Sequence, residues 1–287
     1  MTNQKLHNAK IAKNDEFYTQ LSDIEKELSH YKEHLKGKIV YCNCDDPTFS
    51  NFWKYFHTNF GLLKLKKLIS THYSKESHSY KMEYSGGNDL DCSIGLKTPL
   101  IGDGDFRSQE CIEVLKQSDV VVTNPPFSLF RDYVAQLIKY DKKFIIIGSI
   151  LGLTYKVSLP LTINNKVSLG YNRVREFIQK DGTIKDIHVS RWITNFSIQK
   201  NQEHLNLTEI YTPEKYPKYD NYDAININKT SEIPKDYFGA MGVPVSFLDK
   251  YSPDQFEIIG CNNALPIKHL TLSGKEPFKR IIIKRKI

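Results

Sequence analysis

The sequence has few cysteines and no long apolar run, and both shortages limit what the protein can be. Its 287 residues include five cysteines, and no cysteine or histidine pairs stand at zinc-ligand spacing. We therefore expect reduced thiols, a cytoplasmic location and no bound metal. No apolar run reaches the length of a membrane span, and the N-terminus lacks the apolar core of a signal peptide. We therefore also expect no membrane partner.

Acidic residues are outnumbered by basic ones. The chain has 40 Lys and Arg against 33 Asp and Glu, which gives a net charge of +7. This excess favours a polyanionic partner, although basic residues also serve solubility. Residues 1–14 contain three lysines and no acidic residue. We interpret them as a flexible basic arm, with a phosphate contact as the alternative.

Strand-like and helix-like segments alternate through the first half of the chain. Apolar runs at 38–44, 66–73, 119–124 and 143–150 predict buried strands. Helical spacing predicts helices between them, and the first places Ile24, Leu28, Tyr31 and Leu35 on one face. Such alternation is typical of an α/β fold with a parallel sheet. The polar segment 74–100 then reads as a hairpin or loop insertion.

The second half is less regular and predicts a separate region. Residues 176–198 read as a strand, an Asp181-Gly182 turn and further strands, whereas the tyrosine-rich segment 211–229 is loop-like. The last residues are strongly basic, and we weigh a DNA contact equally against a solvated tail. We expect three parts: the arm 1–14, a catalytic domain 15–200 and a recognition region 201–287.

One motif stands out, Asn124-Pro125-Pro126-Phe127, directly after the predicted strand 119–124. The simplest alternative is a strand followed by a tight turn. However, the carboxyl ends of parallel strands are where open α/β sheets bind ligands. Because prolines cannot continue a central strand, the chain must turn rigidly here. The motif is therefore a candidate active site.

The residue types of this motif suit methylation of an exocyclic amine such as that of adenine. The lone pair of this nitrogen is delocalised into the ring, so the amine is a poor nucleophile. Two acceptors aimed at its hydrogens, the Asn124 side-chain oxygen and the Pro125 carbonyl, would favour a pyramidal nitrogen. Pro125 and Pro126 would fix that carbonyl in advance, and Phe127 would stack on the base.

The motif resembles motif IV of S-adenosylmethionine-dependent amino-methyltransferases. Together with "KNDEFYTQ" (13–20), "VYCNCDDPTFSNFWKYF" (40–56) and "GDGDFRS" (102–108), it makes the chain similar to the EcoRI-type DNA adenine-N6 methyltransferases. The likeness is strongest over residues 13–130 and continues more loosely through 191–196 and 241–260.

This resemblance implies a fold, a reaction and partners. The fold would be a Rossmann-like seven-stranded sheet with helices on both faces, followed by a small C-terminal target-recognition region. The substrates would be S-adenosylmethionine and a flipped adenine of double-stranded DNA. The context would be restriction-modification, with a cognate endonuclease acting separately, or phage-borne or solitary modification. The short chain after motif IV predicts a monomer or a weak dimer.

The resemblance also implies residues that bind the cofactor. Phe17, Tyr18 and Thr19 would lie beside its methionine part, and the alternative is a helix entry with a buried aromatic residue. Asp45 and Asp46 would lie near its amino-acid and ribose groups, and the alternative is a turn with a helix cap.

Three further positions complete the expected site. Ser50 stands, with Asn51, where the wider superfamily has glycines, and it is counted with the cofactor loop. Asp105 would accept from the adenine amine of the cofactor while Phe106 packs on the ring, and the alternative is a Gly-Asp turn. Trp192 would wall the flipped base, with a core tryptophan as the alternative. No acidic residue stands at 71–73 to bind the ribose, so that role has no residue.

Other functions remain open from the sequence. The Asn-Pro-Pro-aromatic motif also serves methylation of an RNA adenine or a protein glutamine, whose amide presents a similar planar nitrogen. The unusual loop at 45–51 would also suit an inactive DNA-binding relative.

Overall fold

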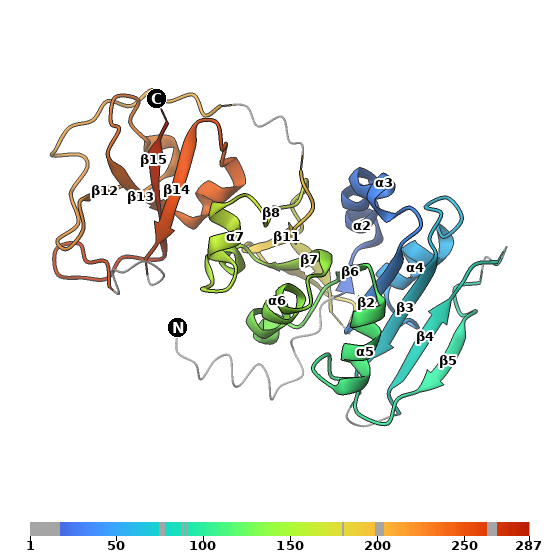
Figure 1. The fold of residues 1–287 in the computed structure, drawn as a ribbon. Helices are drawn as coiled ribbons and strands as arrows, with labels where there is room; N and C mark the ends of the chain where they lie inside the picture. Colours follow the sequence, from blue (N-terminus) through green and yellow to red (C-terminus); the bar gives the residue numbers. More distant parts are fainter. Residues whose placement is uncertain are drawn as a thin grey trace. The chain divides into compact units, whose positions relative to one another are not determined.

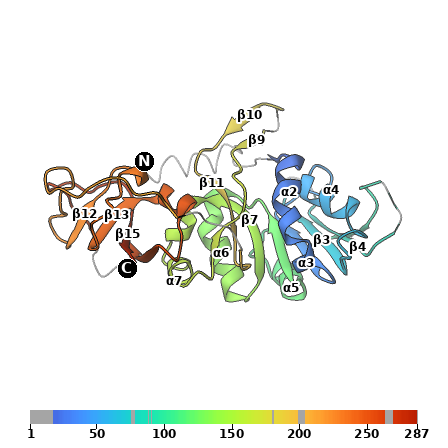
Figure 2. The ribbon, with the colours of Figure 1, turned by 90° about the horizontal axis from the view of Figure 1, so that it is seen from above.

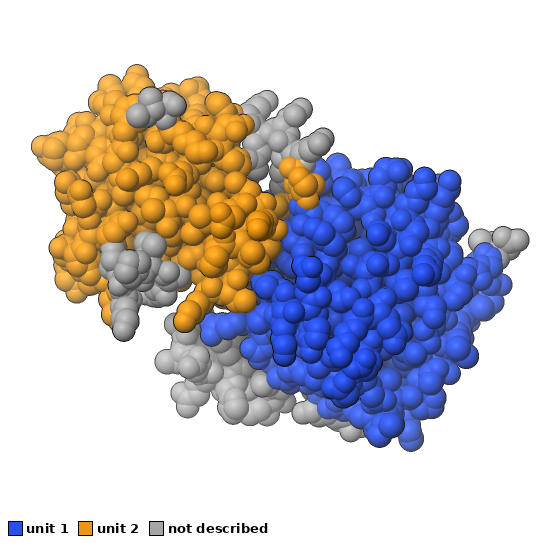
Figure 3. Space-filling model, viewed as in Figure 1, with its two compact units in different colours: residues 1–149, 170–196 blue, residues 150–169, 197–287 orange. Residues whose placement is uncertain are grey.

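The chain folds into two compact units. The computed structural model describes residues 18–74, 78–87, 89, 91–179, 181–198, 204–262 and 269–286, so the expected arm 1–14 and Phe17 lie outside it. One unit comprises residues 1–149 and 170–196, and the other 150–169 and 197–287 (Figure 3). A single boundary at residue 200 does not capture this interleaving. The roles expected for the two parts stay predictions.

The largest sheet has eight strands in the order β5-β4-β3-β2-β6-β7-β11-β8 (Figure 1). Its four central strands run parallel, as the alternation predicted. They are β3 (Lys67–His72), β2 (Ile39–Asn43), β6 (Val120–Thr123) and β7 (Lys143–Ser149). The outer strands are β5 (Leu96–Pro99), β4 (Tyr80–Tyr84), β11 (Ser190–Thr194) and β8 (Ser168–Leu169). The sheet is thus mixed, with β4, β5 and β11 antiparallel to their neighbours.

The strand order creates a switch point between β2 and β6. From β2 the chain moves to β3 on one side, and after β4 and β5 it returns to β6 on the other side of β2. At such a point the loops after the two strands lead away from each other, which opens a crevice at the carboxyl edge. The loop after β2 begins at Cys44, and the loop after β6 begins at Asn124.

Helices cover both faces of the sheet, as right-handed crossovers require when the chain leaves β2 and β6 in opposite directions. The connections are α4 (Asn51–Thr58), α5 (Gln109–Gln117) and α6 (Phe130–Lys139). Val40 and Cys42 of β2 belong to one core cluster with Trp53 of α4. Tyr41, between them on the strand, points the other way and interacts with Cys111 of α5. Figures 1 and 2 show the arrangement.

The first predicted helix is confirmed, with a break. It consists of α2 (Leu21–Leu28), the 3₁₀ turn η1 (Ser29–Tyr31) and α3 (Lys32–Leu35). The side chains expected on its apolar face are at most 1% exposed: Ile24, Leu28, Tyr31 and Leu35. Gly37 follows with φ of 71°, a conformation that favours glycine and ends the helix.

The sequence left 74–100 open between a hairpin and a loop insertion and predicted one hairpin within 176–198, and both segments contain a hairpin. The first is β4–β5, which extends the large sheet beyond β3. The second joins β9 (Glu176–Ile178) to β10 (Ile184–Asp186), and Gly182 in its turn has φ of 81°. The sequence did not predict that β1 (Tyr18–Thr19) pairs antiparallel with β9 to form a three-stranded sheet.

The second unit has its own four-stranded sheet, in the order β12-β13-β15-β14. These strands are β12 (Ala224–Asn226), β13 (Ala240–Pro244), β15 (Arg280–Arg285) and β14 (Phe256–Cys261), accompanied by α7 (Leu159–Ile163) and the 3₁₀ helices η3 (Ile150–Thr154), η4 (Thr230–Glu232) and η5 (Val245–Lys250). The solvated-tail alternative is wrong for residues 280–285, because β15 lies inside the sheet and buries Ile281, Ile282 and Ile283. The DNA contact weighed equally against it stays a prediction. None of the described helices is long and apolar enough to cross a membrane.

Candidate active site

The loop after β2 is held by side chains where a glycine-rich turn would use backbone freedom. The Asn43 side-chain oxygen accepts from the Cys44 amide at 2.8 Å and from the Thr71 hydroxyl at 3.1 Å. Thr123, at the end of β6, donates to the Asn43 carbonyl. Cys44 then adopts φ of 62°, which is unfavourable for a residue with a side chain. These contacts tie the ends of β2, β3 and β6 together.

Asp45 and Ser50 close the loop onto the start of α4. The Ser50 hydroxyl accepts from the amides of Phe52 and Trp53 at 3.0 and 3.1 Å, and it donates to the Asp45 carboxylate. The expected helix-cap alternative is therefore present at Ser50. Burial raises the pKa of Asp45 to about 7, the Ser50 hydrogen bond opposes this shift, and the neighbouring Asp46 adds to it.

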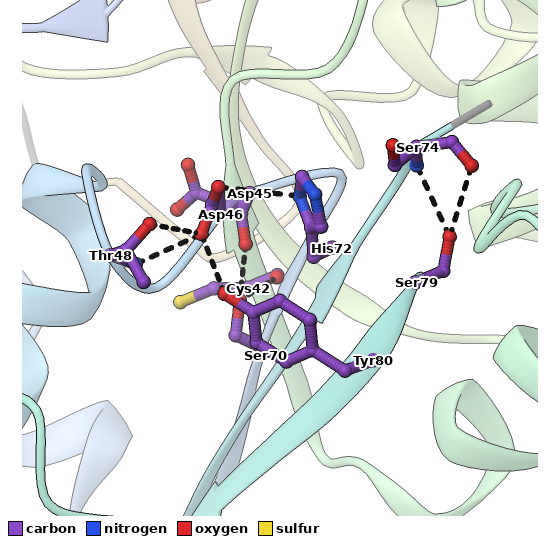
Figure 4. A network of polar contacts seen from close by, with 9 residues as sticks. All are labelled: Cys42, Asp45, Asp46, Thr48, Ser70, His72, Ser74, Ser79 and Tyr80. Atoms are coloured by element: carbon purple, nitrogen blue, oxygen red, sulfur yellow. Dashed lines mark hydrogen bonds and ion pairs between the residues drawn. The ribbon is translucent and has the colours of Figure 1, made fainter. Parts of the chain in front are cut away.

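Asp46 occupies a different setting, although it is the next residue. Its Oδ1 accepts from the Thr48 amide at 2.9 Å, the Thr48 hydroxyl at 2.7 Å and the Tyr80 hydroxyl at 2.8 Å (Figure 4). Its Oδ2 lies 3.4 Å from His72 Nδ1. Desolvation alone would raise the pKa of Asp46, but these partners hold it below the ordinary value. Asp46 is thus a charged acceptor.

The raised pKa of Asp45 predicts a pH-dependent stability. Because its folded pKa of about 7 exceeds the ordinary 3.8, the folded state keeps the proton longer than the unfolded chain. The stabilisation from this group is complete below about pH 4 and is lost as the pH rises to about 7. Asp45→Asn lacks this titration, so its unfolding free energy should rise relative to the wild type across that window and then level off.

Urea unfolding at several pH values, followed by tryptophan fluorescence, measures this difference. Asp132→Asn, which removes an exposed acid on α6, is the matched control for the loss of a carboxylate. A difference for Asp45→Asn that stays constant from pH 4 to pH 8 would contradict the assignment.

The loop at 102–108 approaches the same edge. Arg107 holds both carboxylate oxygens of Asp105, at 2.9 and 2.6 Å. The pKa of the Cys44 thiol is raised, mainly by burial and then by Cys111 and Asp105. The Asp105 carboxylate therefore lies near the loop after β2. Gly104 has φ of 78°, and a Cβ there would lie 2.3 Å from the carbonyl of His72. The loop therefore fits closely over the end of β3.

Phe106 is buried beneath this loop. It is 2% exposed, its ring meets Tyr133 of α6 edge-on at 5.0 Å, and Gln136 donates to its carbonyl at 2.9 Å. In this position it supports the loop that carries Asp105. Its expected packing on an adenine ring stays a prediction.

The Asn-Pro-Pro-Phe motif follows β6 as expected. Pro125 is buried, whereas Asn124, Pro126 and Phe127 are half-buried. Phe127 opens a 3₁₀ turn, η2 (Phe127–Leu129), which leads directly into α6. Its ring meets that of Phe177 on β9 edge-on at 6.2 Å. The β9–β10 hairpin thus contacts the Asn-Pro-Pro-Phe motif.

The strand β1 contacts the start of α4, next to the loop after β2. Asn51, the first residue of α4, donates to the Thr19 carbonyl at 2.8 Å. Thr19 in turn pairs with Phe177 across β1 and β9, while Tyr18, one residue away, points to the other face of that small sheet. Thr19 is therefore better placed than Tyr18 to face the two loops.

Trp192 does not lie with the other expected site residues. It is fully buried on β11, pairs with Ile147 of β7, and meets the ring of Phe52 edge-on at 6.0 Å. The core alternative accounts for this position, because no face of the indole is open to a base.

The structure therefore brings together most of the expected residues at one edge of the sheet. Five residues that sequence reasoning did not single out also belong there: Asn43, His72, Tyr80, Thr123 and Phe177. Their position at strand ends was the available signal for Asn43, His72 and Thr123. Tyr80 and Phe177 lie on hairpins, where no motif marks them. In the described residues no group of three or more His, Cys, Asp or Glu could hold a metal ion.

A mixed sheet with four parallel central strands, an acidic loop after β2 and Asn-Pro-Pro-Phe after β6 is consistent with an α/β enzyme of the methyltransferase type. Comparison with known proteins gives the family. Residues 5–286 match the family described as adenine-specific methyltransferase EcoRI, and the chain belongs to that family of adenine-specific methyltransferases.

Three relatives align with most of this chain over most of their own length. The type II methyltransferase M.EcoRI of Escherichia coli is 47% identical and covers 99% of this chain and 97% of its own. M.MpnI of Mycoplasma pneumoniae is 36% identical over 97% of each chain. M.MgeORF184P of Mycoplasma genitalium is 38% identical over 88% of this chain and 84% of its own. No solved structure matches the chain significantly.

Proposed function

We propose that the protein is a site-specific DNA methyltransferase that transfers a methyl group from S-adenosylmethionine to the N6 atom of a flipped adenine. The observation that carries this proposal is the position of Asn124 to Phe127 at the carboxyl end of β6, across the switch point from the loop that holds Asp45 and Asp46. The relatives named as type II methyltransferases support DNA as the substrate.

The chemistry of the loop residues fits the proposed cofactor. S-adenosylmethionine carries hydroxyl and amine donors as well as a carboxylate acceptor. Asp46 offers a charged acceptor, and the buried polar atoms of the described residues that have no hydrogen-bond partner include Thr19 Oγ1 and Asn43 Nδ2 at this edge. Unpaired buried groups are costly, so they suit a site that is completed by a ligand. Thr19, Asp46 and Asp105 would hold the cofactor, with Asp45 and Ser50 shaping the loop.

When bound, the cofactor supplies an electrophilic methyl group, and the protein supplies position and acceptors. Asn124 and the Pro125 carbonyl accept hydrogen bonds from the two amine hydrogens of adenine. Both acceptors are in place before the reaction, so no reorganisation is needed as positive charge develops on the nitrogen. Phe127, supported by the edge of Phe177, holds the base. The N6–CH3 bond would form as the S–CH3 bond breaks, S-adenosylhomocysteine would be the leaving group, and the methylated nitrogen would then release its extra proton to water.

The polymer substrate and the fold detail follow from the same proposal. Extracting the adenine from a duplex costs a few kcal/mol, about the energy of unstacking and unpairing one base. The second unit, and the β4–β5 hairpin of the first, would read bases through their edges.

The Rossmann-like seven-stranded sheet would consist of the strands from β4 to β8 in their order in the sheet, with β5 added at the edge. We propose a cytoplasmic monomer or weak dimer in a restriction-modification, phage or solitary context, with any endonuclease acting separately.

Nucleoside mass spectrometry tests the proposal. The chain is expressed in a host that lacks adenine methylation, and the digested DNA is examined for N6-methyladenine. We expect the modified base, confined to one short sequence when the methylated sites are mapped. Unmodified DNA together with methylated RNA or protein from the same cells would contradict it and favour the alternative substrates.

A further inference from the structure

The end of β3 holds a histidine where an acidic residue is expected to bind a nucleotide ribose. In doubly wound sheets a carboxylate at the end of the second strand commonly accepts from ribose hydroxyls. Here β3 ends at His72, and residues 71–73 contain no acid. The ribose of the proposed cofactor therefore needs an acceptor from another element.

The loop after β2 supplies a carboxylate at this place. Asp46 reaches the end of β3, where its Oδ2 lies 3.4 Å from His72 Nδ1 (Figure 4). Its other oxygen is occupied by three donors, which are the Thr48 amide, the Thr48 hydroxyl and the Tyr80 hydroxyl. A carboxylate oxygen accepts about two hydrogen bonds comfortably, so Oδ1 is saturated. Oδ2, with His72 as its partner, is the oxygen that can accept from a ligand.

Asp45 is the competing candidate, and its contacts argue against it. Its carboxylate accepts from the Ser50 hydroxyl, which in turn caps α4. Burial favours its neutral form, whereas the partners of Asp46 favour the charged form. A charged acceptor binds a hydroxyl more strongly than a neutral one. The two adjacent acids thus have different tasks.

We infer that Asp46 is the acceptor for the ribose hydroxyls of the cofactor, and that His72, Thr48 and Tyr80 are positioning residues that orient its carboxylate. This inference rests on the proposed function. It moves the ribose acceptor from the end of β3 to the neighbouring loop. It also gives the β4 strand a role, because Tyr80 at its start fixes the acceptor while Lys97 of β5 lies 3.7 Å from the centre of the Tyr80 ring.

Calorimetry without DNA tests the assignment directly. The ligands are S-adenosylhomocysteine and its 2′,3′-dideoxy analogue, which lacks both hydroxyls. We expect Asp46→Asn to weaken binding of the first ligand by about 10- to 100-fold, the range for hydrogen bonds to a charged group. The same substitution should leave the affinity for the analogue nearly unchanged. Asp45→Asn should weaken both ligands equally or neither.

A second variant separates positioning from folding. Tyr80→Phe removes one of the three bonds to Oδ1 and keeps the ring, so its melting temperature should stay close to that of the wild type. We expect a smaller loss for S-adenosylhomocysteine, about 3- to 10-fold as for one ordinary hydrogen bond, and none for the analogue. Asp223→Asn, on the exposed surface of the second unit, is the control carboxylate.

The outcomes distinguish the two proposals. If the wild type binds neither ligand, the proposed cofactor is wrong. If the wild type binds S-adenosylhomocysteine and Asp46→Asn loses both ligands equally, or neither, Asp46 is only a structural part of the turn and the inference is overturned. Should Asp46→Asn fail to fold, Tyr80→Phe gives the same decision, because equal losses for both ligands contradict a ribose contact.

Discussion

Replacing Asn124 by alanine should lower kcat for adenine methylation by about 10²- to 10³-fold or more, the range for removal of one preorganised transition-state partner. In the proposed mechanism the side-chain oxygen accepts from an amine hydrogen, and this bond strengthens as the nitrogen becomes positively charged. Affinity for duplex DNA should change little, because Asn124 contacts no phosphate in the proposed mechanism. Steady-state methylation at saturating DNA and cofactor measures kcat, and fluorescence anisotropy with a duplex that carries the mapped site measures binding.

Asn164→Ala is a suitable control. This asparagine makes a hydrogen bond through its side chain, donating at 2.7 Å to the Pro160 carbonyl, and it lies at the end of α7 in the second unit. Its kcat should match the wild type. Turnover of Asn124→Ala within a few-fold of the wild type would remove Asn124 from the mechanism. A parallel loss of DNA affinity would show that its role is in binding.

The central sheet could be predicted from the sequence because its signals are local. Strands β2, β6 and β7 are continuous apolar runs, and the helices between them bury one face at regular spacing. The Asn-Pro-Pro-Phe motif could be placed at the end of β6 for the same reason, since two prolines must end a central strand.

Contacts between distant segments were not predictable in this way. The bond from Tyr80 to Asp46 joins residues 34 positions apart, and neither residue belongs to a pattern that implies the other. The pairing of β1 with β9 spans even more of the chain. The strand at 280–285 was not predicted, because charged residues dominate the composition of this segment, whereas the burial of its three isoleucines places it in the sheet.

Burial also separates residues that look alike in the sequence. Phe106 and Phe127 are both aromatic residues of the sequence motifs, yet the first is 2% exposed and the second is half-buried. Asp45 and Asp46 are neighbours with opposite pKa shifts. Such differences depend on which donors and rings the fold brings near, and a single sequence does not contain that information.

A buried glutamate outside the sequence motifs holds the segment that leads into β9, the strand whose Phe177 contacts Phe127. Glu27 of α2 is fully buried, and its carboxylate accepts four hydrogen bonds from the described residues. The donors are the Tyr31 hydroxyl at 3.1 Å, the amides of Tyr171 and Asn172 at 2.8 and 2.7 Å, and the Asn172 side chain at 3.0 Å. Gly170 precedes this segment because a Cβ there would lie 2.2 Å from Glu27 Oε1.

Glu27→Ala should therefore lower the unfolding free energy of the first unit by about 3 kcal/mol or more, since several buried donors lose their acceptor at roughly 1–3 kcal/mol each. The loss should also reach catalysis. Residues 171–172 lead into β9, whose Phe177 supports the ring of Phe127, so a loosened segment should lower kcat more than it raises KM for the cofactor.

Urea unfolding followed by tryptophan fluorescence measures the stability of this unit, because both tryptophans of the chain, Trp53 and Trp192, are buried in its core. Glu25→Ala is the matched control, an exposed glutamate on the same helix, and it should unfold like the wild type. Glu27→Gln should fall between the two, because one oxygen remains an acceptor while the new NH₂ group faces other donors. Equal urea midpoints for Glu27→Ala and Glu25→Ala would contradict this role. They would mean that the pairing of β9 with β1 holds Phe177 in place without the Glu27 carboxylate.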